Sequence, residues 1–440
     1  MSAVAAPPRQ RSLWAESAVA APILPELMGA QDAEVAIVGA GYSGLSTALS
    51  LAERGVAAIV VEASEPGAGA SGRNGGQVIP GLRHFPDELV KAYGRERGRR
   101  LFEFGAGAAD AAFALIRRHG LDCDATQSGW IQAAENEAAL AESYRRADAW
   151  AAFGAPTHRL GRDAFLRLTG SDAYIGGWID ERGGSVQPLS YARELARAAV
   201  GAGARVFARS PAVSITRRGS DWRVETPRGA VTARRVLVAT NAMADGLWPG
   251  LAQALIPVWS FQIATAPLPL SAMALAPGAV VSDTRRVLSY FRRDRDGRLI
   301  VGGKGTLRAP RGPASFALQR RTLARLYPAL ADAAPAYYWG GQVAVTLNRL
   351  PRLFRLEDGV FATIGCNGKG VAWTTALGPV LAQALTGAPL ESLPLPPAEP
   401  LRPIPLHGLE QAYAAVGGAW LRLRDRIDSV SLPSHRKAPS

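Results

Sequence analysis

The sequence predicts an α/β fold in which short buried strands run directly into glycine turns and helices. Three stretches support this prediction. Residues 34–62 read as strand, glycine turn, helix and strand, residues 235–239 as a buried strand followed by polar residues, and residues 360–370 as a strand that ends in a second glycine turn. Short apolar runs of this kind are typical of parallel strands buried on both faces.

The first glycine turn has the spacing of a dinucleotide-binding motif. Gly39, Gly41 and Gly44 form G-x-G-x-x-G between the first strand and the helix. The first glycine permits a tight turn, the second lets the backbone approach a pyrophosphate, and the third lets the helix pack close to the sheet. Glu62 ends the next strand, where a carboxylate can accept hydrogen bonds from ribose hydroxyls. A glycine turn without a ligand is the alternative, but the accompanying strands, helix and acid favour dinucleotide binding.

Length and composition favour a globular protein with two domains, or one core with an inserted lobe. The chain has 440 residues, of which 48% are hydrophobic and 20% are charged. Cys123 and Cys366 are its only cysteines, so no disulfide framework is predicted, which suits a reducing cytoplasm.

The net charge of +13 raises the question of nucleic-acid binding. The basic residues are scattered and almost all are arginine, with lysine only at positions 91, 304, 369 and 437. No nucleic-acid-binding motif accompanies them, so we predict no such partner. The histidines show no metal-ligand spacing and no G-x-S-x-G motif occurs, so we predict neither a metal site nor hydrolase chemistry.

No stretch is long and apolar enough to predict a membrane span, and residues 1–30 lack the apolar run of a secretion signal. We therefore expect a cytoplasmic protein. Residues 1–30 are predicted to form an extended arm and residues 425–440 a frayed basic tail, while the proline-rich residues 393–405 are predicted to form a linker or surface strap.

The segment after Glu62 is a glycine-rich loop at residues 64–81, which we expect to wrap around a ligand because it follows a dinucleotide unit directly. Hydrophobic periodicity and turn residues then predict the further elements up to residue 203. These are helices at 86–120, 135–153 and 189–200 and short strands at 129–133 and 176–179.

The second half of the chain is predicted to be richer in strands. Polar residues follow the buried strand 235–239 at its carboxyl end, where open α/β sheets bind ligands. Pro249 and Gly250 after Trp248, and Pro257 further on, are predicted to mark the crossing into another lobe. The other predicted elements are strands at 204–208, 212–217, 221–226, 230–232, 261–266, 286–291, 299–302 and 342–346, and helices at 315–326 and 371–385.

The second glycine turn, GCNGKG at residues 365–370, repeats the order of strand, turn and helix. The chain thus brings two helix N-termini toward one ligand. This arrangement suits FAD better than NAD, because a flavin ring also needs donors at its polar edge.

Five motifs in this order resemble a known group of enzymes. GAGYSG, ASGRNGG, VLVATNA, LNRLP and GCNGKGVA are similar to motifs of the FAD-dependent amine and amino-acid oxidases of the D-amino-acid-oxidase-like superfamily. SLWAESA near the N-terminus and ASGRNGGQ are most similar to gamma-glutamylputrescine oxidase-like enzymes. The resemblance runs from about residue 12 to about residue 390.

The resemblance implies a Rossmann-like FAD-binding domain from discontinuous segments and a mainly antiparallel-sheet substrate domain. The FAD-binding segments would be 31–90, 185–248 and 355–392, the substrate-lobe segments 91–184 and 249–354, and the C-terminal strap and tail 393–440.

The implied reaction is oxidation of a C–N bond of a small amine or amino acid by hydride transfer to flavin N5. Imine hydrolysis and reoxidation by O2 would follow and give H2O2. One alternative is an amine or amino-acid dehydrogenase that passes electrons to a quinone or carrier, and a more distant one is a flavoprotein acting on tRNA.

The resemblance also assigns cofactor-binding residues by motif position. The ADP half would contact Gly39, Gly41, Gly44 and Glu62, and the pyrophosphate and ring would contact Ser71, Arg73, Asn74, Gly75 and Gly76. Two residues, Thr240 and Asn241, would close over the cofactor. The pyrimidine edge would be reached by Asn367, Gly368, Gly370 and Val371.

One position departs from the family pattern. Lys369 stands where many relatives have histidine, and a cation there could stabilise the anionic reduced flavin. A solvent-facing loop lysine is the alternative. An aromatic, partly charged substrate pocket could be formed by Tyr290, Arg292, Trp339 and Arg349. Together with Lys369, the residues that we predict to take part in catalysis are Tyr290 and Arg349. Cys366 is predicted to be a buried packing residue, so the FAD is expected to be held non-covalently.

Overall fold

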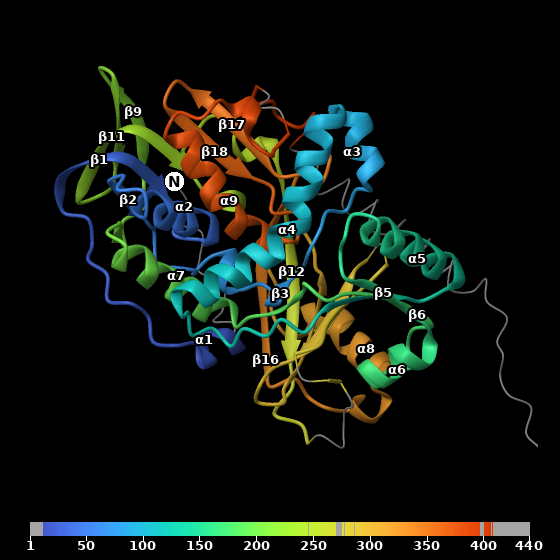
Figure 1. Cartoon of the computed structure of the whole chain (residues 1–440). Coiled ribbons are helices and arrows are strands. Elements are labelled where there is room, and N and C mark those ends of the chain that lie inside the picture. Colours follow the sequence, from blue (N-terminus) through green and yellow to red (C-terminus); the bar gives the residue numbers. More distant parts are fainter. Residues whose placement is uncertain are drawn as a thin grey trace, which may run out of the picture.

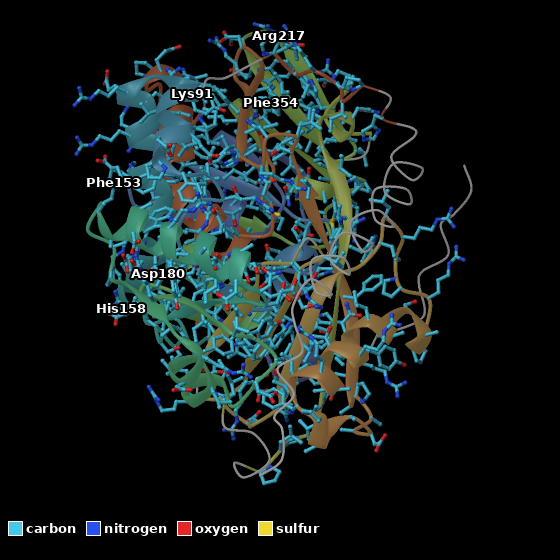
Figure 2. All side chains as sticks on the ribbon, turned by 90° about the vertical axis from the view of Figure 1, so that its right-hand side faces the viewer. Lys91, Phe153, His158, Asp180, Arg217 and Phe354 are labelled. Carbon is cyan, nitrogen blue, oxygen red and sulfur yellow. The ribbon has the colours of Figure 1, made fainter. Side chains whose placement is uncertain are left out.

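The computed structural model describes residues 12–244, 246–269, 275–276, 278–285, 287–396, 400–405 and 407. Two eight-stranded sheets, each with its own covering helices, lie at opposite ends of the molecule (Figure 1). Figure 2 shows Arg217 and Phe354 on the first sheet at one end, and Asp180 and His158 on the second sheet toward the other. The predicted tail at residues 425–440 lies outside the described residues.

The first sheet is the predicted dinucleotide-binding sheet, with the order β17-β18-β11-β1-β2-β8. Its strands from β18 to β8 are parallel, and their apolar runs are buried. An antiparallel hairpin, β9–β10, extends from β11. The bounds are β1 Gly29–Val38, β2 Ala58–Val61, β8 Arg205–Phe207, β9 Ser214–Arg218, β10 Asp221–Glu225, β11 Gly229–Val238, β17 Arg352–Glu357 and β18 Val360–Ile364.

The predicted strands 230–232 and 235–239 are one continuous strand, β11, in parallel register with the whole of β1. The separate strands were wrong because two consecutive arginines interrupt the apolar pattern. In the structure Arg234 is exposed, while the Arg235 guanidinium donates to the carbonyl of Leu385 at the end of helix α9.

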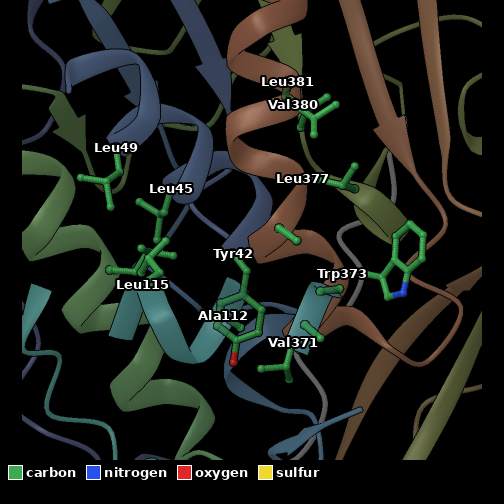
Figure 3. Close-up of a cluster of buried hydrophobic side chains, with 14 of the residues drawn as sticks. Tyr42, Leu45, Leu49, Ala112, Leu115, Val371, Trp373, Leu377, Val380 and Leu381 are labelled. Carbon is green, nitrogen blue, oxygen red and sulfur yellow. The ribbon is translucent and has the colours of Figure 1, made fainter. Parts of the chain in front are cut away.

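Helices α2 and α9 lie side by side on the first sheet, with α4 against them (Figure 3). Leu45 and Leu49 of α2, Leu115 of α4 and Leu377 of α9 belong to one buried core. The helices of this half are α1 Leu13–Ser17, α2 Tyr42–Ala52, α3 Pro86–Tyr93, α4 Arg95–His119, α7 Pro188–Gly201 and α9 Gly370–Leu385. The predicted helix 86–120 is two helices, because Gly94 between them adopts φ +80° and ψ 162°.

The close approach of α2 and α9 depends on a glycine. A Cβ added at Gly378 would lie 2.1 Å from the Ser46 hydroxyl, which itself donates to the carbonyl of Thr375 at 2.7 Å. We expect Gly378→Ala to lower the free energy of unfolding by about 1–3 kcal/mol through overpacking. Urea unfolding measures this, with Gly107→Ala on α4 as the control because nothing lies within 4 Å of its added Cβ. Equal midpoints for the two variants would contradict the prediction.

The second sheet is mainly antiparallel, with the order β16-β12-β15-β14-β13-β4-β6-β5 and one parallel pair, β13 with β4. Helices α5, α6 and α8 accompany it (Figure 1). The bounds are β4 Trp130–Ala134, β5 Thr157–Leu160, β6 Gly176–Asp180, β12 Ile256–Ala264, β13 Val280–Asp283, β14 Ser289–Arg293, β15 Leu299–Lys304, β16 Tyr337–Val345, α5 Glu137–Ala151, α6 Arg162–Thr169 and α8 Ala317–Leu326. The predicted α/β fold with a second, mainly antiparallel lobe is therefore confirmed; the residue boundaries of the two domains stay a prediction.

Short elements complete the chain and correct one expectation. The chain passes from β11 of the first sheet to β12 of the second between Val238 and Ile256, where the crossing was predicted. Pro257 is the second residue of β12 and is tolerated there because β12 pairs with β15 only from Ser260 onward. Residues 12–30 are not an extended arm, since Leu13 and Trp14 of α1 are fully buried. The small strands β3 Gln77–Val78 and β7 Gly184–Ser185 pair with each other, and the 3₁₀ turns are η1 Ala70–Gly72, η2 Asn241–Met243, η3 Ala252–Ala254, η5 Pro313–Phe316, η6 Pro328–Leu330 and η7 Leu390–Ser392.

None of the helices in the described ranges combines the length and the apolar character that crossing a membrane requires.

Candidate functional site

The first glycine turn joins β1 to α2 with almost no free space. Gly39 adopts φ +106°, a conformation that only glycine takes up readily. A Cβ on Gly44 would lie 2.0 Å from the carbonyl oxygen of Gly39, and one on Gly41 would lie 2.9 Å from the Ser71 hydroxyl. Gly41 is the N-cap of α2 and has no side chain to cap the helix. The N–H of Tyr42, the first of the helix, donates to the Ser71 hydroxyl at 3.1 Å, and Gly41, Tyr42 and Ser43 at this helix N-terminus line a cavity.

Glu62 lies at the carboxyl end of β2, beside this turn. Its carboxylate accepts hydrogen bonds from the backbone N–H of Ala40 at 2.8 Å and of Ser64 at 3.0 Å. These bonds fix its orientation and leave further lone pairs for ribose hydroxyls.

The loop at residues 70–76 is held against α2 by its own polar side chains. The Ser71 hydroxyl accepts from the N–H of Tyr42, and the Asn74 amide donates to the Ser71 carbonyl at 2.7 Å and accepts from the N–H of Gly76. Arg73 donates through Nε to the carbonyl of Ala68, and burial lowers its pKa. Ser71, Arg73, Asn74 and Gly75 line the same cavity as Gly39 and Gly41, whereas Gly44 and Gly76 lie behind it in close backbone contacts.

The second glycine turn follows β18 and is tied to the end of β11. Asn241, at φ +49°, accepts from the N–H of Gly365 at 3.0 Å and donates to the Cys366 sulfur. Asn367, at φ +47°, accepts from the N–H of Thr346 and donates to the Gly365 carbonyl. Helix α9 then begins at Gly370 without a side-chain cap at Lys369.

Both turns line one cavity of about 1940 Å³. Its wall includes Glu62, Thr240, Asn241, Asn367, Gly368, Lys369, Gly370 and Val371. The Thr240 hydroxyl is buried and has no hydrogen-bond partner among the described residues, which points to a polar ligand group. The N-termini of two helices, an acid at the carboxyl end of β2 and this orphan hydroxyl together fit FAD.

Lys369 points into the protein rather than to solvent. Its ammonium donates to the carbonyls of Pro80 at 2.9 Å and Gly81 at 3.1 Å, and lies 5.4 Å from the centre of the Trp130 ring. Burial, followed by the positive charge of Arg146, lowers its pKa to about 7. The side chain thereby joins the second glycine turn to the loop that follows β3.

This buried lysine makes stability depend on pH. The unfolded chain, with a lysine pKa of 10.5, binds a proton between about pH 7 and pH 10.5 that the folded chain does not hold. The wild type should therefore gain stability relative to Lys369→Met as pH rises through this window. Urea unfolding of both proteins across the window tests this, and a difference that does not change with pH would contradict it.

Tyr290 on β14 of the second sheet and Arg349, in the connection from β16 to β17, both line the cavity. The Tyr290 ring fits between Gly75 and Gly302, where an added Cβ would lie 2.5 Å and 2.2 Å from ring carbons. Its hydroxyl bonds Ser260 at 2.9 Å, and burial raises its pKa to about 12. Arg349 adopts φ +57°, and burial, followed by the charge of Arg83, lowers its pKa.

Arg292 and Trp339 do not belong to the predicted substrate pocket. Arg292 is 1% exposed, donates to the Val186 carbonyl and lies 5.0 Å from the centre of the Trp14 ring. Trp339 is fully buried and donates to the carbonyl of Arg73. Both side chains support the back of the loop at residues 70–76 instead of facing a ligand.

Cys366 is half-buried rather than buried, since it lines the cavity beside Asn241. The sequence analysis also missed part of the wall, namely Arg83, Trp130, Arg146 and Trp178. Trp130 and Trp178 lie on the predicted strands 129–133 and 176–179, and this was the available sign that these strands border the cavity. The hydrophobic pattern of a strand does not tell which of its two faces meets a ligand.

Comparisons with known proteins agree with this site. Residues 34–384 match the DAO family, described as FAD dependent oxidoreductase. The chain is 33% identical to gamma-glutamylputrescine oxidoreductase of Escherichia coli over 90% of this chain and 93% of that protein, and 32% identical to a probable oxidoreductase, OrdL, of Haemophilus influenzae over 82% and 85%. Glycine oxidase from Geobacillus kaustophilus shares the fold, with a TM-score of 0.69 at 23% identity over 81% of this chain and 95% of that one. The predicted resemblance is thereby confirmed, and the chain belongs to the DAO family of FAD-dependent oxidoreductases.

Proposed function

We propose that this enzyme oxidises a C–N bond of a small amine or amino acid, with a gamma-glutamylputrescine-like compound as the first candidate. The observation that carries the proposal is the single cavity that contains both glycine turns and continues to a wall with Tyr290, Arg349 and Lys369. FAD supplies the two-electron acceptor when it is bound. The 33% identity to gamma-glutamylputrescine oxidoreductase supports this choice of substrate class.

We assign roles to the three wall residues from their contacts. Tyr290 packs on the backbone of the loop at residues 70–76 and, because its hydroxyl stays protonated at neutral pH, can donate a hydrogen bond to the substrate. Arg349 presents a positive charge to an anionic part of the substrate. Below about pH 7, Lys369 places a positive charge beside the second glycine turn, the turn assigned to the pyrimidine edge of FAD.

The test of the proposal is anaerobic bleaching of the bound flavin by a panel of diamines, acylated diamines and amino acids. The expected result is rapid loss of the oxidised flavin absorbance with at least one amine of the panel. A flavin that remains oxidised with every amine, although dithionite reduces it, would overturn the proposal.

We further propose that O2 is the electron acceptor, that the FAD is held non-covalently and that the protein acts in the cytoplasm. Stoichiometric H2O2 during aerobic turnover would support the first point, while turnover that requires an added quinone or carrier would favour the dehydrogenase alternative. Acid precipitation should release the flavin from the protein, because Cys366 is already engaged by the Asn241 amide.

A further inference from the structure

Arg292 is a buried cation with few partners. Its side chain is 1% exposed, and its guanidinium donates to the Val186 carbonyl at 3.0 Å, while its buried Nε has no hydrogen-bond partner among the described residues. In the same part of the chain, no carboxylate oxygen comes within 4.0 Å of the guanidinium. The acids whose charges act on it are Asp294, which is itself paired with Arg298 at 3.1 Å, and Asp124. A buried charge that is so poorly compensated costs stability, which indicates a role beyond packing.

The contacts of Arg292 place its charge against the back of the loop at residues 70–76. Its guanidinium lies 5.0 Å from the centre of the Trp14 ring, whose N–H donates to the Asn74 carbonyl of that loop. A Cβ added at Gly76 would lie 2.8 Å from Arg292 Nη2. Gly76, at φ +69°, therefore lets the loop backbone lie directly on the charged group.

The front of the same loop forms part of the cavity wall. Gly75 lines the cavity, and the Tyr290 ring packs on it. Tyr290 and Arg292 are two residues apart on β14, so their side chains leave the same face of the strand. Tyr290 reaches the cavity, whereas Arg292 meets the loop one residue further on, at Gly76. The loop backbone therefore lies between the charge of Arg292 and the cavity.

The charge of Arg292 persists at neutral and mildly alkaline pH. Burial lowers the pKa of Arg292 to about 10, so the side chain remains a cation at pH 8. Lys369, at the second glycine turn, is mostly neutral at that pH, because burial lowers its pKa to about 7. Coulomb interactions are stronger inside a protein than in water, so a buried cation acts across a layer of backbone.

The cofactor changes its charge on reduction. Two electrons and one proton convert the neutral ring of oxidised FAD to the anionic ring of the reduced form. We propose that the Arg292 cation acts through the backbone of Gly75 and Gly76 on the bound FAD, and that it raises the reduction potential by favouring the anionic reduced form. The inference rests on the binding of FAD along the loop at residues 70–76 and goes beyond the proposed function, because it does not depend on which amine is oxidised.

The test is the reduction potential of the bound FAD at pH 8, measured by titration with dithionite against a reference dye. Arg292→Gln keeps a hydrogen-bond donor for the Val186 carbonyl but removes the charge. The equilibrium constant for two-electron reduction should fall about tenfold or more in this variant, which corresponds to about 30 mV for a two-electron couple. Arg292→Lys keeps the charge and should stay within about threefold of wild type.

Arg293→Gln is the matched control. Arg293 is the next residue of β14, so its side chain leaves the opposite face of the strand, and it does not line the cavity. This variant should stay within about twofold of wild type. A wild-type potential in Arg292→Gln would overturn the inference. An equal fall in Arg292→Lys or in Arg293→Gln would also overturn it, since altered structure or net charge would then be the cause.

Asp124→Asn decides the question if Arg292→Gln does not fold. Asp124 is half-buried, and its negative charge opposes that of Arg292. Asparagine has the same shape and tolerates the φ of +49° at this position. The equilibrium constant for reduction should rise about two- to fivefold, and a value at or below that of wild type would overturn the inference. If no amine bleaches the flavin but the potential still depends on Arg292, the proposed function fails while this inference stands.

Discussion

Gly44→Ala should abolish high-affinity binding of FAD. The added Cβ would lie 2.0 Å from the carbonyl oxygen of Gly39, far inside contact distance, and neither this Cβ nor the backbone oxygen can turn away as the end of a flexible side chain could. Helix α2 would have to move away from the turn, and the N–H groups of its first turn would lose their alignment on the pyrophosphate. Losing one or two charge-assisted hydrogen bonds weakens binding by about 100-fold or more, which flavin absorbance of the purified protein and FAD titration measure.

Gly201→Ala is the control for this substitution. Gly201 ends α7, and nothing lies within 4 Å of its added Cβ. Its flavin content should equal that of the wild type. If Gly44→Ala also retains wild-type flavin content and affinity, the N-terminus of α2 does not bind the cofactor and the assignment of the first glycine turn is wrong.

Arg349→Met should lower kcat/KM for an amine with an anionic group by about tenfold, the cost of losing one charge-assisted hydrogen bond from a side chain that stays exposed to solvent. Arg349 lines the cavity and has no acidic partner among the described residues. Its φ of +57° is equally strained for methionine, so the substitution should leave the backbone unchanged. Steady-state kinetics and flavin content measure the two effects separately.

Arg355→Met is the matched control, because Arg355 is exposed on the neighbouring strand β17 and pairs with Asp358. Arg349→Lys should recover part of the loss by keeping the charge without the planar guanidinium. A kcat/KM within about twofold of wild type for Arg349→Met would show that Arg349 does not contact the substrate.

Local sequence pattern was sufficient for the parts of the site that are built within one short segment. Gly39 and Gly44 can be predicted because their roles depend on the turn between one strand and the next helix, and Glu62 because it ends the strand that follows. Gly365 belongs to the second turn of the same kind. The strand before each glycine turn and the helix after it could be predicted as well, because each is encoded by the hydrophobic pattern of a short continuous segment.

Features that depend on contacts between distant segments were not predictable. Trp14 looked like part of an arm, and is buried because its indole donates to the carbonyl of Asn74 and packs on Trp339. The direction of Lys369 is set by two carbonyls of the loop after β3, far away in the sequence. Arg146 reaches the cavity only because α5 packs beside that loop, which no periodicity reveals.

The central claim is that two glycine turns far apart in the sequence enclose one FAD. Titration of the apoprotein with FAD, followed by flavin absorbance and fluorescence, tests it most directly. We predict saturation at one FAD per chain with the structured absorption band of a protein-bound flavin. A titration in which the spectrum stays that of free FAD at every ratio would contradict the claim.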